Sequence, residues 1–209
     1  MAYYLRDAQI TNVVSFAGDF HAHFASLVYD DYDSDSPRAQ MAEFVTASIS
    51  SMSQFAAVEQ LARREAVDAT EEILRSLITY DARAATQPGT DARVVNLNTT
   101  LRFGSRATVA VARDNTQAAI DDNTDPSVNP HLRYADTAAH GFGVVRVTAD
   151  EITTQLVAID SIVVDSADGP AVLRRATFVV PHAAPGDEST MALPAVAGQA
   201  PFPLSLGVT

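Results

Sequence analysis

The chain has 209 residues, of which 47% are hydrophobic and 19% charged, so it is long and apolar enough to bury a core, and general disorder is excluded. Its formal net charge is −12, all 14 basic residues are arginine, and cysteine is absent. An acidic surface repels phosphate backbones, which excludes nucleic-acid binding through a basic face. Without thiolates, any metal must be bound by carboxylate, imidazole, amide or backbone oxygen.

The first predicted element is the short apolar run VVSFA at 13–17, which Gly18 and Asp19 end. This profile is typical of a buried strand in an α/β sheet. Residues 21–29 form either a helix or a second strand, and their periodicity does not decide. The acidic run 30–38 is a loop, either a solvated turn or a calcium ligand set, although its carboxylates lack EF-hand spacing. Residues 42–51 alternate like a strand and end in serines that can cap a helix.

Residues 52–80 carry the clearest helical pattern. Apolar side chains recur there at three- and four-residue spacing, with charged residues between them, so the stripe predicts a long helix packed on the core. Its apolar positions are Phe55, Val58, Leu61, Ile73, Leu74, Leu77 and Ile78. Pro88 and Gly89 break the pattern. Residues 94–121 are ambiguous, since a strand-like VVNLN precedes an alanine-rich stretch, and residues 121–131 are predicted to form a loop.

The last third of the chain is rich in β-forming residues. Residues 141–164 contain two such runs joined by a turn, and residues 174–181 form a third, which predicts an antiparallel meander. From Pro181 the sequence is rich in Pro, Ala and Gly, and we expect it to lie extended or loose. This divides the chain into a domain at 1–181 and a tail at 182–209. No apolar run is long enough to span a membrane, and no secretory signal is visible at the N-terminus.

A candidate site follows the first predicted strand. Asp19 stands where open α/β sheets place their ligands, and His21 lies two residues further on. Together they point to a metal site, which would bind phosphate oxygens and activate water. The alternative is a polar turn that happens to contain histidines. His23 is expected to pack or hydrogen-bond rather than to ligate. Neither a nucleophile-elbow motif nor a Walker-type loop occurs in the sequence.

An ordered set of motifs extends this interpretation. NVVSFAGDFHAHF (12–24), AEFVTASISS (42–51), NPHLRYADTAAHGFGVVRVTADEITTQLVAID (129–160) and RRATFVV (174–180) resemble the C-terminal part of the PhoD-like, or alkaline phosphatase D, family. The resemblance implies an α/β (α+β) fold, namely the C-terminal part of a calcineurin-like metallophosphoesterase sandwich with a long helix and an antiparallel meander. It also implies a metal-dependent phosphoesterase that hydrolyses phosphomonoesters or phosphodiesters with metal-activated water.

Site residues follow from the matched positions. Asp19 matches the carboxylate that ligates metal, and His21 matches the neighbouring histidine, expected at the metal or beside the substrate phosphate as a catalytic group. Asn129 and His131 match a segment expected near the substrate. Calcium and iron are the metals that the resemblance implies. His140-Gly141-Phe142 replaces the usual Arg-Gly-Tyr, so no tyrosine role transfers to this chain.

One departure from the family pattern concerns the remaining ligands. Family members carry most of their metal ligands upstream of the Gly-Asp-x-His strand, so we expect this chain to be incomplete as an enzyme and to need the missing N-terminal half. Its strand at 12–17 would then present an unpaired edge. The resemblance implies export to the periplasm or the exterior. The alternative function is a non-catalytic structural or protein-binding remnant of the same fold.

Overall fold

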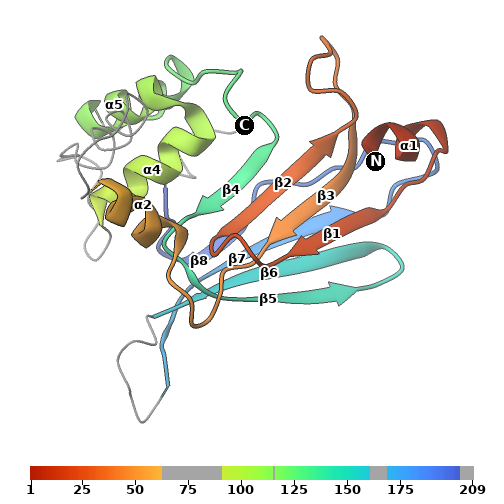
Figure 1. The fold of residues 1–209 in the computed structure, drawn as a ribbon. Helices are drawn as coiled ribbons and strands as arrows, with labels where there is room; N and C mark the ends of the chain where they lie inside the picture. The colour runs from red at the N-terminus through yellow and green to blue at the C-terminus, as the bar shows by residue number, and fades with distance from the viewer. Residues whose placement is uncertain (63–90, 115, 161–168, 203–209) are drawn as a thin grey trace.

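Two four-stranded sheets form the framework of the protein (Figure 1). The computed structural model describes residues 1–62, 91–114, 116–160 and 169–202. The first sheet has the order β1-β3-β2-β4 and the second the order β5-β6-β7-β8. The strands of the first sheet are β1 (Val13–Ala17), β2 (His23–Tyr29), β3 (Ala39–Val45) and β4 (Leu132–Asp136). Those of the second are β5 (His140–Val147), β6 (Glu151–Ile159), β7 (Val172–Pro181) and β8 (Ala195–Gly198).

The two sheets pack face to face and share one core. Phe44, Ala25 and Tyr134 occupy paired positions across the first sheet, so their side chains lie on the same face. On that face the rings of Phe44 and Tyr134 both contact Phe178 of β7, at centroid distances of 5.4 and 5.7 Å. The expected α/β sandwich is therefore present, and β5, β6 and β7 form the expected antiparallel meander.

Strand β1 is less buried than its apolar sequence predicts. It pairs only with β3, in parallel, and its other edge has no strand beside it among the described residues. Phe16 is 47% exposed although its ring stacks on Phe44. The prediction of a buried strand is wrong for this reason, since β1 is half-buried to exposed, whereas the expectation of an unpaired edge is confirmed among the described residues.

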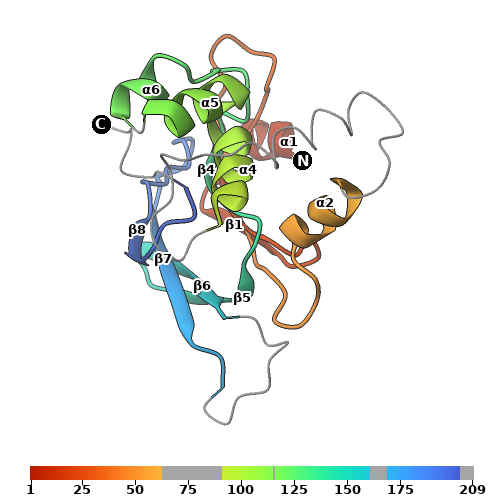
Figure 2. The same ribbon diagram turned by 90° about the vertical axis from the view of Figure 1, so that its left-hand side faces the viewer.

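Three helices occupy the region whose sequence was ambiguous: α4 (Ala92–Phe103), α5 (Ser105–Asp114) and α6 (Gln117–Asp121). Asp91 caps α4 by accepting a hydrogen bond from the backbone N–H of Arg93, and Thr116 caps α6 in the same way. The strand-like VVNLN lies inside α4, where burial on nearly all sides removes the amphipathic pattern. Figure 2 shows these helices grouped at one end of the sandwich, beside β4.

Two further helices complete the described elements: α1 (Ala2–Asp7) and α2 (Gln54–Ala62). Ser53 accepts a hydrogen bond from the N–H of Ala56 and so caps α2, as its serine-rich approach predicts. Of the helix expected over 52–80, only this first part falls within the described residues. The strand expected over 42–51 ends at Val45, because β3 leaves the first sheet there and residues 46–53 form a loop.

The segment after β7 is extended but not loose. Its strand β8 pairs antiparallel with β7, from Arg174↔Gly198 to Thr177↔Ala195. Met191 and Phe202 belong to the shared core, and the ring of Phe202 lies 5.8 Å from that of Tyr134. These contacts attach residues 191–202 to the sandwich. The division into a domain and a tail at residue 181 stays a prediction.

Candidate functional site

Asp19 lies at the carboxyl edge of the parallel pair β1–β3. Both strands run toward this edge, where the N–H of Thr46 donates to the carbonyl of Ala17 over 2.8 Å. Gly18 and Asp19 follow β1 directly, and the loop 46–53 follows β3. Loops at the carboxyl ends of parallel strands are where open α/β sheets bind ligands. The predicted position of Asp19 is therefore the observed one.

The Asp19 carboxylate is available for a ligand. Its residue is exposed, and the side chain makes no hydrogen bond or ion pair to any described residue. A carboxylate without an internal partner keeps all of its lone pairs, which suits a hard or borderline cation.

His21 is held in a defined orientation next to Asp19. Its Nδ1–H donates to the carbonyl of Met52 over 2.9 Å, and its own carbonyl accepts from the N–H of Gln54 over 3.0 Å. With the proton on Nδ1, the lone pair is on Nε2, which is the arrangement that metal-bound histidines adopt. The backbone of His21 has φ +56°, in the left-handed region that non-glycine residues rarely enter outside functional or strained turns. The side chains present thus fit two positions of a cation site.

His23, unlike His21, is a structural residue. It is fully buried, its Nδ1 accepts from the N–H of Ala47 over 2.9 Å, and its Nε2–H donates to the carbonyl of Val157 over 3.1 Å. These two bonds join the start of β2 to the loop 46–53 and to β6. This agrees with the expectation that His23 hydrogen-bonds rather than ligates. Burial lowers its pKa, against the opposing charge of Asp136.

Acidic pH is therefore expected to destabilise the fold through His23. The unfolded chain takes up a proton near pH 6.5, whereas the buried ring does not, so stability is complete above that pH and falls below it. The expected loss is up to about 1.4 kcal/mol per pH unit. Urea unfolding at pH 7.5 and 5.5 measures it in the wild type, in His23→Asn and in the exposed control His182→Asn.

His23→Asn should remove this part of the slope, while His182→Asn should keep it. Any slope that remains in His23→Asn belongs to half-buried His131, whose pKa is also lowered by burial. The role of His23 would be refuted if His23→Asn kept the full slope.

Behind His23 lies a buried ion pair. The Arg174 guanidinium donates from Nε to the Asp136 carboxylate over 2.7 Å, and its terminal nitrogen lies 2.6 Å from the same oxygen. Asp136 is fully buried, and it pairs with His23 across β2 and β4. Burial is the largest single influence and acts to lower the pKa of Arg174, but the charges and hydrogen bonds of Asp136 and Tyr134 together outweigh it, so the net shift is upward. Sequence reasoning missed this pair because its members are 38 residues apart and show no shared motif.

Gly141 admits no side chain at its position in β5. A Cβ there would lie 1.9 Å from the carbonyl oxygen of Val157 and 2.9 Å from His23 Nε2. Gly141→Ala is therefore expected to destabilise the protein by at least about 3 kcal/mol, since backbone and a fixed ring must both move. Gly18→Ala, whose Cβ would meet only Thr46 Oγ1 at 3.9 Å, should change stability by less than about 1 kcal/mol. Urea unfolding of both variants tests this, and equal losses would contradict it.

The structure separates Asn129 and His131 from Asp19 and His21. Strand β4 runs antiparallel to β2, so residues that precede β4 lie beside the far end of β2, where the N–H of Leu27 donates to the carbonyl of His131 over 3.0 Å. The four-residue step from His23 to Leu27 spans about 13 Å of strand. Asn129 donates from Nδ2 to the carbonyl of Leu101 over 2.9 Å and so supports the end of α4. Asp19 and His21 therefore form one candidate site, and His131 lies in another environment.

Two ligands do not complete a metal centre. Within residues 1–62, 91–114, 116–160 and 169–202, no three His, Asp or Glu side chains come close enough together to hold an ion. The acidic loop 30–38 uses part of its charge internally, because Asp30 accepts hydrogen bonds from the N–H groups of Asp31 and Arg38 and pairs with Arg6. A metal centre that used Asp19 and His21 would need further ligands from outside the described residues.

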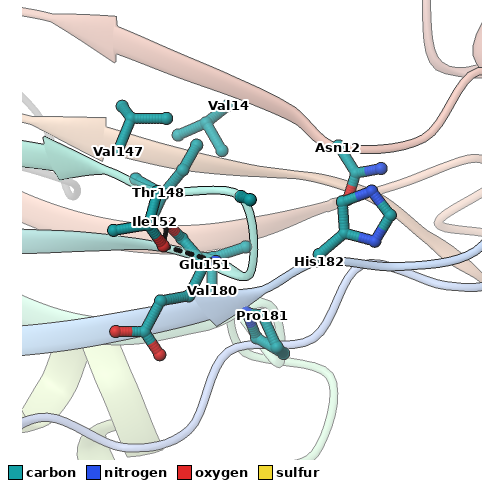
Figure 3. Close-up of a pocket in the computed structure, with 10 residues that line it drawn as sticks. Asn12, Val14, Val147, Thr148, Glu151, Ile152, Val180, Pro181 and His182 are labelled. Atoms are coloured by element: carbon teal, nitrogen blue, oxygen red, sulfur yellow. Dashed lines mark hydrogen bonds between the residues drawn. The ribbon is translucent and has the colours of Figure 1, made fainter.

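A groove of about 150 Å³ opens between the two sheets at the opposite end of β1 (Figure 3). Asn12 and Val14 from β1 and its approach line one side, and the β5–β6 turn and the end of β7 line the other. Its walls are Asn12, Val14, Val147, Thr148, Ala149, Glu151, Ile152, Val180, Pro181 and His182. The only dashed contact drawn there is within the turn, between Thr148 and Glu151. The groove therefore does not coincide with the Asp19–His21 edge.

Comparison with known proteins bears on this site. A sequence model of the PhoD-like phosphatases matches residues 1–103. Among solved structures, the chain is similar to one described as a structure of PhoD, with 17% identity and a TM-score of 0.48; the match covers 95% of this chain and 25% of that one. The chain thus spans about a quarter of that protein's length. No curated protein matches it. In the described part of the chain, no helix is long and apolar enough to cross a membrane.

Proposed function

Because a sequence model of the PhoD-like phosphatases matches its residues 1–103, we propose that this chain supplies part of the active site of a metal-dependent phosphoesterase. The substrates would be phosphomonoesters or phosphodiesters. One observation carries the proposal: His21 is oriented by Met52 so that Nε2 keeps its lone pair, two residues after Asp19 with its uncommitted carboxylate. Both lie at the ligand-binding edge of the β1–β3 pair.

In this proposal Asp19 and His21 hold the cation, and calcium and iron are the metals we expect by resemblance. A bound cation of this class stabilises charge on the phosphoryl group and activates water for attack. The chain's own contribution is orientation. The Met52 carbonyl keeps His21 in one tautomer, and the buried His23 anchors the loop that carries Met52 by accepting from Ala47. Export, which the resemblance implies, is also part of the proposal.

Hydrolysis of p-nitrophenyl phosphate and bis-p-nitrophenyl phosphate tests this function. The 209-residue chain is assayed alone and together with a polypeptide that carries the rest of the family's catalytic fold, with calcium and iron added and metal content measured. We expect metal-dependent turnover that a chelator removes, in at least one of the two forms. Absence of turnover and of bound metal in both would contradict the proposal.

That second outcome corresponds to the alternative function, a non-catalytic structural or protein-binding module. The observation that favours it is the lack of a three-ligand cluster in the described part of the chain. The unpaired edge of β1 would then serve a protein partner by strand addition.

A further inference from the structure

A group of basic side chains near the junction of α4 and β4 forms no ion pair with a described residue. Arg102, in the last turn of α4, is only 9% exposed, and its guanidinium lies over the ring of Phe103 at 4.8 Å. It makes no hydrogen bond or ion pair to any described residue. The chain has a net charge of −12 and many carboxylates, so a buried arginine without a carboxylate partner is unexpected.

Two buried nitrogen atoms without a hydrogen-bond partner in the described residues lie in the same region, namely Nε of Arg133 and Nδ1 of His131. Nε of Arg133 is a donor, and Nδ1 of His131 is a donor in the tautomer that carries its proton there. The charge of Arg133 acts on Arg102, and the charges of both arginines act on His131. The three side chains are therefore close enough to one another to share an electrostatic environment.

The charges around this cluster leave it positive. Burial, followed by the charge of Arg133, lowers the pKa of Arg102 to about 10, so it stays protonated at neutral pH. The negative charge of Glu43 acts on His131, and its two oxygens lie within hydrogen-bond reach of the hydroxyls of Ser15 and Ser26. By contrast, the other strongly buried arginine in the described residues, Arg174, is paired with Asp136.

We propose that Arg102, Arg133 and His131 form a binding site for a tetrahedral oxyanion, namely inorganic phosphate or the phosphate group of a phosphomonoester. Two guanidinium groups and an imidazole present more N–H donors than the two oxygens of a carboxylate can accept. A phosphate group has more acceptor oxygens and can accept hydrogen bonds from all three side chains at once. Asn129 helps to position Arg102, because it supports the preceding carbonyl of Leu101.

The site differs from the Asp19–His21 edge and does not rest on the proposed function. It lies at the other end of β2 and requires no metal, so it can be tested in the presence of a chelator. Failure of one proposal therefore leaves the other untouched.

Phosphate binding by the 209-residue chain in EDTA is the test. Calorimetric titration and the unfolding temperature are measured in inorganic phosphate, with potassium chloride and acetate at equal ionic strength as references. The wild type should bind phosphate saturably and unfold at a higher temperature in it. Arg102→Met should weaken binding about tenfold or more, the loss expected for a charge-assisted hydrogen bond. Arg146→Met, at an exposed position in β5, should bind like the wild type.

A second signature separates an anion site from ordinary packing. In chloride, Arg102→Met should be at least as stable as the wild type, because it removes a buried cation that lacks a partner. If Arg102→Met does not fold, Arg133→Met takes its place and should show the same loss of phosphate binding. The proposal would be overturned by unsaturable binding in the wild type, by wild-type binding in both arginine variants, or by an equal response to acetate, which would make a carboxylate the occupant.

Discussion

Replacing Asp19 with alanine is expected to reduce phosphate-ester hydrolysis by at least about 100-fold in whichever form of the protein is active, because the change removes a proposed metal ligand. Loss of even a supporting group around a metal ligand costs up to about 100-fold, so loss of the ligand itself should cost no less. The fold should be unaffected, since the Asp19 side chain is exposed and makes no hydrogen bond to a described residue.

The matched control for Asp19→Ala is Asp35→Ala. Asp35 is an equally exposed carboxylate in the loop between β2 and β3, at the end of β2 remote from Asp19. Hydrolysis, bound metal and unfolding temperature are measured for both variants. Asp19→Ala should lose turnover and metal together at an unchanged unfolding temperature, and Asp35→Ala should lose neither. Normal turnover in Asp19→Ala would remove Asp19 from the metal site.

Arg174→Met should destabilise the protein by about 3–5 kcal/mol, because it leaves the fully buried Asp136 carboxylate without its counter-charge. The Asp136 atom Oδ1 already has no hydrogen-bond partner within the described residues, and the neighbouring Tyr134 hydroxyl is neutral, so it does not replace the lost positive charge. Urea unfolding at neutral pH measures the effect.

Two controls define the origin of that loss. The double variant Arg174→Met with Asp136→Leu should recover most of the stability, since replacing both members of a buried pair by apolar residues is often nearly neutral. Arg175→Met, at the exposed next position of β7, should change stability by less than about 0.5 kcal/mol. If the double variant were no more stable than Arg174→Met, lost packing rather than the unpaired carboxylate would be the cause.

Sequence patterns predicted the local elements best where runs of β-forming residues are separated by turn residues. The meander β5–β6–β7 consists of such runs, and the apolar run at 13–17 ends at Gly18 just where β1 ends. The pattern did not predict α4, because Val94–Thr99 are buried on nearly all sides of the helix. It also predicted too long a strand at 42–51, since β3 ends at Val45 and the serine-rich residues after it lie in a loop.

The candidate site was predicted only in part, because the sequence shows only what lies close together along the chain. Asp19 and His21 are two residues apart, so a short motif contains both. The partners that orient them are distant in sequence: Met52 for His21, and Val157 for His23, which holds the Met52 loop. The register of the strands brings these groups together. Which strands pair, and in which register, cannot be predicted from the local pattern of a single sequence.

By itself, the sequence determined that the chain is acidic and able to bury a core, and it placed most strands along the chain. It also gave the turn that carries Asp19 and the motifs that relate the chain to the phosphatase family. Only the tertiary structure decided which of these residues meet. It joined Asp136 to Arg174, moved His131 to the far end of the sheet from Asp19, and left Arg102 buried without a carboxylate. The physical reason is that periodicity reports which face of an element is buried, whereas strand pairing and packing decide what that face contacts.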